Sequence, residues 1–495
     1  MADTEVYEVE TQAEAFGEKV QCSKLTVWAG VNGYAQAHIY FPPPDAPDAS
    51  KEAKAITSAD VASRMGQMQQ KAFAARSTAD SSVHVKVTGG TGGVNIKLKG
   101  YGQAPEYTFS PQTVNVGASI LDEMAAIDVA RFGIYGSTYQ DQNVRAFNTY
   151  GKTLKDCGWS IPDCLYSMAE DMVKNADKSV AFSGKNLTSL DKQTKYAQHN
   201  LNKQVLPLLK KLCENSKQFG WKDTLNGLKS AGLKSSVDTE IRRCLCGHLV
   251  SSSGSFLTAL LGICEDFQCV LVCATSSDGM EYEMRSKQYV MASPEPLTIP
   301  IRDLNAQAAG GAGIFPTRFV AVTREGPVDT NVTTTTQFMA FPEGNMKQGG
   351  TALPVSPPSW MNGIHADAAK AKDSGEPAQR SGCQKTSGGE IQQATDEQCK
   401  ATNEDSESIM KEWAKCCYLW NALGTSQALI NAPMIVEVVP GKRYQVKNVN
   451  GDTLFTGFAS SVEYSLQTGS GSSNSATTFV TFTHVEFGSF SLPTD

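Results

Sequence analysis

Residues 444 to 485 read YQVKNVNGDTLFTGFASSVEYSLQTGSGSSNSATTFVTFTHV, and this stretch decides the fold class. Apolar and polar residues alternate along three runs, as in strands that bury one face. Asn450-Gly451 separates the first two runs and is a strong hairpin signal, because both residues tolerate a positive φ. A polar loop from Gly469 to Ser475 separates the last two. The sequence therefore predicts that the chain ends in an all-β module.

The first part of the chain has a similar build. Strands are expected at 24–40 and 83–116, with an insert at 43–80 that holds a Pro-rich loop and a helix from Ala59 to Arg76. The glycines between Thr88 and Gly93 resemble a phosphate-binding loop. A phosphate loop needs a helix after its glycines, and here a strand follows, so we interpret the segment as a hairpin tip.

In the middle of the chain the spacing of apolar residues changes from the alternation of strands to the period of helices. Helices are expected at 120–132, 162–175, 186–213 and 255–264, and Pro207 should kink or divide the third. The fold class is therefore α+β, with two small β-modules near the two ends. We divide the chain into five parts: a β-module at 1–118, a mainly helical domain at 119–270, a β-rich segment at 271–342, a Gly/Ser-rich linker or cross-linked loop at 343–410, and a short helix followed by the C-terminal β-module at 411–495.

Composition limits the possible functions. The 495-residue chain has a net charge of −7 and no clustered basic face, which argues against general nucleic-acid binding. The acidic N-terminus has neither the basic nor the apolar region of a signal peptide, and no run of 18 apolar residues occurs. We expect a protein made in a cytoplasm without a membrane-spanning segment.

Thirteen cysteines allow more than one interpretation. Cys244-x-Cys246-x-His248 has no matching second pair and departs from zinc-ribbon and zinc-finger spacing, so buried structural thiols are favoured and no metal site is expected. Disulfides are the alternative, formed late in an oxidising exterior. Cys157 with Cys164 and Cys383 with Cys399 are the candidate pairs.

Catalytic motifs are absent from the sequence. Gly-x-Ser-x-Gly, His-Glu-x-x-His and the phosphate-loop pattern do not occur, and the six histidines are scattered. A Cys/His nucleophile pair stays open, because such partners meet in space. We interpret His484 as a sheet or rim residue. The prediction is a protein that is not an enzyme and has no cofactor.

The segment from Leu454 to Val485 resembles a recurring pattern of baseplate hub proteins from contractile-tailed phages and related injection systems. A strand with a glycine, a polar loop, and a Thr-Thr strand that ends in His-Val carry the resemblance. The matching residues are Gly457, Thr477, Thr478, His484 and Val485. In that family, tail-tube-like β-barrels form a ring of six from three copies. The resemblance therefore implies that the β-modules near the two ends are tail-tube-like β-barrels.

The resemblance implies a structural role in a virion tail that is assembled in the host cytoplasm. The chain would form a homotrimer that joins the sixfold tail tube protein to a threefold central spike protein, beside other baseplate proteins. DNA would pass through its channel during genome ejection without specific binding. The alternatives are a tail-tip peptidoglycan hydrolase and a receptor- or glycan-binding β-protein.

Overall fold

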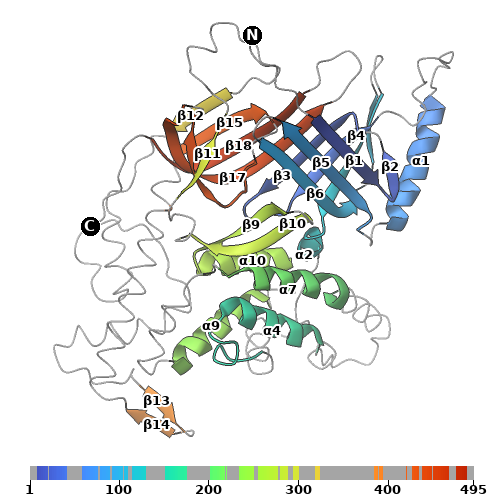
Figure 1. Ribbon diagram of the computed structural model, residues 1–495. Helices are drawn as coiled ribbons and strands as arrows, with labels where there is room; N and C mark the ends of the chain where they lie inside the picture. Colours follow the sequence, from blue (N-terminus) through green and yellow to red (C-terminus); the bar gives the residue numbers. More distant parts are fainter. Residues whose placement is uncertain are drawn as a thin grey trace, which may run out of the picture.

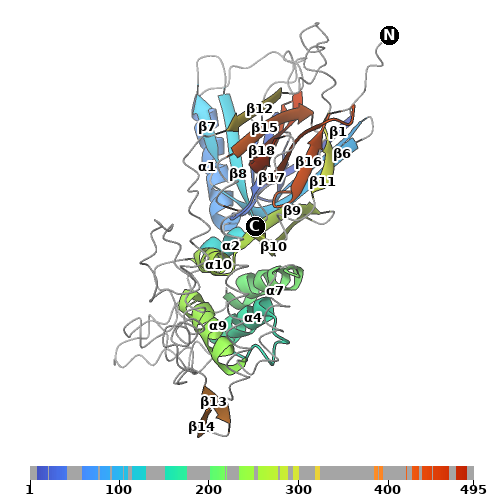
Figure 2. The same ribbon diagram turned by 90° about the vertical axis from the view of Figure 1, so that its left-hand side faces the viewer.

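A computed structural model gives the arrangement of the chain (Figure 1). It describes residues 8–20, 22–41, 58–75, 79–89, 92–103, 105–109, 114–129, 151–174, 201–217, 219, 234–249, 255–276, 279–287, 294–299, 318–323, 384–387, 390–393, 420, 426–433, 437–448, 450–467 and 475–487. Figure 2, turned by a quarter, shows a β-layer above a group of helices. The α+β class is confirmed.

The N-terminal β-module contains eight antiparallel strands in the order β3-β4-β8-β6-β5-β1-β2, with β7 beside β8. Alternating valines, isoleucine and leucine of β5 and β6 face the core, and the predicted hairpin pairs Gly89 with Gly92. Helix α1 (Ser58–Ala75) lies in the expected insert. The strands are β1 (Glu8–Ala15), β2 (Glu18–Val20), β3 (Lys24–Gly30), β4 (Gln36–Phe41), β5 (Ser81–Gly89), β6 (Gly92–Gly102), β7 (Glu106–Phe109) and β8 (Val114–Asp122).

The C-terminal β-module is built around one long strand, β17, which pairs with β16 and β18. The Asn450-Gly451 hairpin is confirmed between β16 and β17, and Gly451 alone of the two has a positive φ. Asn448 stabilises this turn by accepting hydrogen bonds from the backbone of Asn450 and Asp452. The strands are β11 (Glu295–Thr298), β12 (Arg318–Thr323), β15 (Ser426–Pro433), β16 (Arg443–Lys447), β17 (Thr453–Gln467) and β18 (Ser475–Glu486).

The two modules form one sheet, which the sequence did not predict. β17 pairs antiparallel with β3, so a 14-stranded sheet runs from β12 at one end to β2 at the other. Within the described residues this order does not return on itself. The two expected β-barrel modules are therefore two parts of a continuous sheet, which does not close within the described residues. The edges of β3 and β17 satisfy each other's backbone hydrogen bonds.

The helical part lies below this sheet (Figure 1). Its core consists of apolar side chains from α4, α7, α9 and α10, and it is continuous with the core of the sheet. None of the helices in the described ranges has the length and apolarity to cross a membrane. The elements are α2 (Ala125–Val129), α4 (Ile161–Lys174), the π-helical turn η1 (Leu201–Val205), α7 (Leu206–Asn215), α9 (Lys234–Leu249) and α10 (Phe256–Asp266), followed by β9 (Cys269–Ser276) and β10 (Gly279–Ser286).

Some boundaries differ from expectation. The helix predicted from Ile120 is wrong at its start, because β8 continues to Asp122, and up to Val129, where the description of this region stops, α2 is the helical part. Ile120 lies in an alternating buried pattern with Ala118, which fits a strand as well as a helix. Pro207 does divide its segment, since η1 ends at Val205 and α7 has the proline in its first turn. Helix α9 was not predicted.

The excursion expected at 343–410 contains a two-stranded antiparallel hairpin, β13 (Gln384–Ser387) with β14 (Glu390–Gln393). The remainder of that segment lies outside the described residues, as does the short helix expected before the C-terminal module, apart from Trp420.

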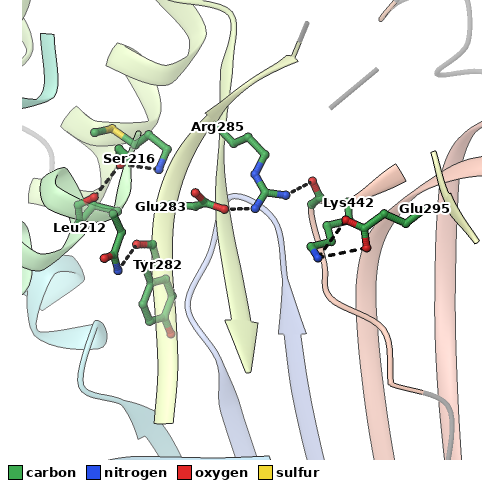
Figure 3. A network of polar contacts seen from close by, with 10 residues as sticks. Leu212, Ser216, Tyr282, Glu283, Arg285, Glu295 and Lys442 are labelled. Atoms are coloured by element: carbon green, nitrogen blue, oxygen red, sulfur yellow. Dashed lines mark hydrogen bonds and ion pairs between the residues drawn. The ribbon is translucent and has the colours of Figure 1, made fainter. Parts of the chain in front are cut away.

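Strand β10 connects the helices to the sheet. The backbone N–H of Met284 donates to Ser216 Oγ at 2.8 Å, and Ser216 donates to the Leu212 carbonyl of α7 at 2.6 Å. On the other side Arg285 pairs with Glu283 and donates to the Gly441 carbonyl at 3.0 Å (Figure 3). The strand is therefore held at once by the helical part and by the turn before β16.

A second buried contact of β10 involves Asp122 at the end of β8. The Tyr282 hydroxyl donates to Asp122 at 2.8 Å and accepts from the backbone N–H of Ala35 at 3.0 Å. Burial raises the pKa of the Asp122 carboxyl to about 6, against the hydrogen bonds from Met124 and Tyr282 that lower it. One tyrosine thus satisfies polar groups from β8 and from the turn before β4.

Candidate assembly site at the junction of the two modules

The junction depends on how β17 divides one of its edges between two partners. Its first half pairs with β16, from Thr453 to Phe458, and its second half pairs with β3, from Ser461 to Gln467. Its other edge pairs with β18. β17 therefore belongs to both modules, and its partner changes where the register with β18 shifts, at Ala459–Ser461.

A β-bulge lies next to this change of partner. Phe458 pairs with Thr483 and Thr456 pairs with Glu486, so His484 and Val485 both lie opposite Gly457. His484 has a φ of 54°, which non-glycine residues seldom adopt. A Cβ on Gly457 would lie 3.1 Å from Val485, closer than almost all real contacts. The glycine and the His-Val pair of the sequence pattern therefore meet in one structural feature.

The His484 ring is packed inside the module. Its centroid lies 3.9 Å from that of Trp420 and 5.8 Å from that of Phe458, and Nδ1 lies 2.9 Å from Thr483 Oγ1. Burial lowers the pKa of the imidazole to about 4, and the positive charges of Lys287 and Arg443 act in the same direction. His484 is therefore neutral at neutral pH and packs as an aromatic side chain.

Thr477 and Thr478 lie at the other end of β18. Thr477 pairs with Pro433 of β15 and Ser465 of β17, and Thr478 pairs with Ala432 and Tyr464. All five residues of the sequence pattern thus belong to β17 and β18, and β18 lies between two strands. They therefore lie on inner strands of the C-terminal module, while β12 and β2 end the main strand order and β11 and β7 pair at its sides.

The β9–β10 hairpin crosses below the junction and contacts both modules. Asn32, in the turn after β3, donates from its backbone to the Leu271 carbonyl at 2.7 Å, and its side chain accepts from Leu271 N–H at 3.1 Å. Gly441 of the other module lies against Val272, where a Cβ would be only 2.3 Å away. The hairpin therefore fixes the two modules relative to each other.

Sequence reasoning missed this hairpin's role. The sequence placed a β-rich segment from residue 271 on, but the residues that this hairpin holds, Asn32 and Gly441, lie far away in the chain. The sequence held one local signal, a glycine at position 441 shortly before an alternating strand. In the structure this glycine has a φ of +86°. Such a glycine indicates a special backbone position without indicating what it contacts.

The structure joins none of the described cysteines in a disulfide, and most of them are buried. Burial raises the pKa values of Cys246, Cys264 and Cys273 to about 12, which makes these thiols unreactive. A hydrogen bond from the Cys164 side chain lowers the pKa of Cys157, so this candidate pair is adjacent. Cys383 and Cys399 lie outside the described residues.

We predict that mild oxidation of the folded full-length chain joins Cys157 to Cys164. The two side chains are in contact and Cys157 is partly exposed, whereas the buried Cys246, Cys264 and Cys273 should stay reduced. Non-reducing peptide mass spectrometry measures each linkage. Free thiols at both positions after oxidation would refute the prediction.

We predict that His484 makes the chain less stable in acid. Its pKa is lower in the folded chain than the usual 6.5, so the unfolded chain binds more protons and stability falls as pH drops from 6.5 towards 4. The loss approaches about 3 kcal/mol at full protonation. His484→Asn should remove this part of the pH dependence, while costing about 1–3 kcal/mol at neutral pH through lost ring packing.

The measurement is urea unfolding of both proteins at pH 7.5 and 5. His84→Asn is the control, because His84 lies at the surface of β5 and bonds Asn95 at 2.9 Å. It makes the same substitution elsewhere in the sheet and so separates the effect of position 484 from that of replacing a histidine. An equal loss of stability on acidification in the wild type and His484→Asn would contradict the account.

No family model matches the chain, and no curated protein matches it. Solved structures do align with it. A tail protein from Neisseria meningitidis is 8% identical with a TM-score of 0.34, covering 96% of each chain. A 43 kDa tail protein of prophage MuSo2 from Shewanella oneidensis is 10% identical with a TM-score of 0.36, covering 96% of this chain and 98% of that one.

A third similar structure is an E. coli component of the type VI secretion system, described as structurally similar to the T4 bacteriophage tail proteins gp27 and gp5. It is 8% identical with a TM-score of 0.33, and the alignment covers 96% of this chain and 76% of that one. These three structures are tail proteins or are described as similar to tail proteins.

Proposed function

We propose that the chain is a structural component of a phage-type tail baseplate, a trimeric hub that joins a sixfold tail tube to a threefold central spike. The β3–β17 junction carries the proposal, because it holds two β-modules of one chain side by side in one sheet. Three such chains supply six modules in a ring. The ring would match sixfold symmetry on one face and threefold symmetry on the other.

The open ends of the sheet support contacts between copies. β12 and β2 are the terminal strands of the pairing order, and they lie on different modules. A contact between unlike surfaces of neighbouring copies generates a closed ring when the rotation fits. Terminal strands can form such contacts by adding to a neighbour's sheet.

Helix α1 marks the β2 end of the sheet as a contact surface. Lys71 of α1 forms an ion pair with Glu18 of β2, which places the helix beside this edge. Phe73 on the same helix is 66% exposed, the most exposed of the large apolar side chains that the structure describes. We propose that Phe73 packs against the neighbouring copy in the ring.

The chain's acidity fits a channel that DNA traverses. With a net charge of −7, the ring can present negative charge to the DNA backbone and prevent binding during passage. A density map of the assembled ring tests this charge directly. A lumen lined mainly by lysine and arginine would contradict this part of the proposal.

The proposed partners are the tail tube protein, the spike and other baseplate proteins, within the virion tail. We expect no enzymatic activity of the chain. Clearing of cell walls by the pure protein would show a peptidoglycan hydrolase, and binding to intact host cells would show a receptor-binding protein.

We predict a trimer of the 53.1 kDa chain in light scattering, with six similar modules around its axis in particle images. Phe73→Asp should raise the dissociation constant of the trimer at least about 30-fold, since an interfacial aromatic residue often contributes about 2 kcal/mol or more. Asn95→Asp adds the same charge to the exposed face of an interior strand and should assemble normally.

Circular dichroism of both variants would confirm that their folds are intact. A wild-type chain that stays monomeric at tens of micromolar would refute the hub, while equal assembly of the two variants would exclude Phe73 from the contact.

A further inference from the structure

Three potential metal ligands meet where α9 packs against α10. Cys244 and His248 are four residues apart on α9, so they share a face of that helix. Asp266 is the last residue of α10. Its Oδ2 lies 3.0 Å from Cys244 Sγ and 2.7 Å from His248 Nε2, and the three ligand atoms all lie within 4.8 Å of one another.

We propose that Cys244, His248 and Asp266 form a binding site for a divalent transition metal, with Zn²⁺ as the preferred ion. The set combines a thiol, an imidazole and a carboxylate, the three ligand types that Zn²⁺ uses in proteins. Two of these residues were noted in the sequence. The third lies 18 positions beyond His248, which is why spacing alone predicted no metal site.

The separations are close to those of a metal site. Zinc lies about 2.0–2.3 Å from such ligands, so tetrahedral ligand atoms are about 3.3–3.6 Å apart. The contacts at 2.7 and 3.0 Å must therefore open by roughly 0.5 Å, and rotation of the Asp266 carboxylate can provide this.

The surrounding structure positions the ligands. Gly262 of α10 lies under the His248 ring, where a Cβ would be 2.6 Å from Cε1 and Nδ1, so only glycine allows this approach. Leucines and isoleucines of both helices are buried in the same hydrophobic core. The ligands also lie near the C-terminal ends of α9 and α10, where helix dipoles favour a cation.

The site is accessible to an ion from solvent. The Cys244 residue is buried, whereas the His248 and Asp266 side chains are 31% and 27% exposed. Three protein ligands leave a fourth position on the open side for water. The metal would join α9 to α10, directly before β9, and would stiffen the support below the junction of the modules.

The arrangement differs from that of a nucleophilic cysteine. In a Cys-His-acid triad the imidazole lies between the thiol and the carboxylate. Here the thiol and the imidazole both contact the same oxygen of Asp266, so the carboxylate lies between them. The three ligand atoms are therefore grouped around the carboxylate, and these residues do not form a thiol–imidazole–carboxylate relay.

Titration of the chelator-treated full-length chain with Co²⁺ tests the proposal, because thiolate coordination gives a distinct charge-transfer absorption. We expect one equivalent to bind with that absorption and Zn²⁺ to displace it. Cys244→Ser should abolish the absorption, and His248→Gln and Asp266→Asn should each weaken binding at least about 100-fold, by more than changes to outer-shell residues usually do.

Cys246→Ser is the matched control, since Cys246 is a buried thiol on the same helix outside the set, and it should bind like the wild type. Circular dichroism checks whether each variant folds. If Cys244→Ser does not fold, the test depends on His248→Gln and Asp266→Asn, which replace partly exposed side chains. Absence of the absorption in the wild type, or its persistence in a folded Cys244→Ser or in both other variants, would overturn the proposal.

Discussion

Seven residue pairs between β3 and β17 hold the first and last parts of the chain in one sheet. These strands come from opposite ends of the sequence, but the entropic cost of closing a loop grows slowly with its length. Pairing also covers the free edge of β3 and half of one edge of β17, which would otherwise expose unpaired backbone groups. The order of the chain, β then α then β, follows from this closure: the middle of the chain leaves the sheet after β8 and returns before the C-terminal module.

The middle of the chain stabilises the arrangement of the two modules that the β3–β17 pairing creates. The β9–β10 hairpin contacts Asn32 on one side of the junction and Gly441 on the other, so the two modules cannot rotate freely about the shared strands. Tyr282 and Arg285 extend this connection with buried hydrogen bonds. A rigid pair of modules is what a ring component needs, because its symmetry depends on a fixed angle between them. The proposed metal site would link α9 to α10, the helices below the β9–β10 hairpin.

Local patterns in the sequence predicted local structure well. Asn450-Gly451 predicted its hairpin, the alternating residues around Val85 and Ile96 predicted β5 and β6, and Pro207 marked a division between two helical segments. Each of these signals depends on neighbours in the chain. Ile120 shows where this fails, because one short apolar run fits both a strand and a helix.

Features that depend on distant partners could not be predicted in this way. Nothing near β3 indicates that β17 is its neighbour, and nothing near Cys244 indicates Asp266. The C-terminal pattern was recognised, but the bulge that explains Gly457 and His484 needs the register of two strands. The disulfide proposed between Cys383 and Cys399 and the domain limits stay predictions.

Cross-linking of the junction tests the account most directly. Thr26 and Ser465 lie opposite each other in the β3–β17 pair, whereas Thr26 and Glu463 are offset by two residues. Opposite residues are about 4.5–5.5 Å apart, within disulfide reach, and offset residues are about 7–8 Å apart. Mild oxidation followed by peptide mass spectrometry should therefore join Thr26→Cys/Ser465→Cys in the full-length chain and leave Thr26→Cys/Glu463→Cys largely unlinked. No link in the first variant, or equal links in both, would contradict the continuous sheet.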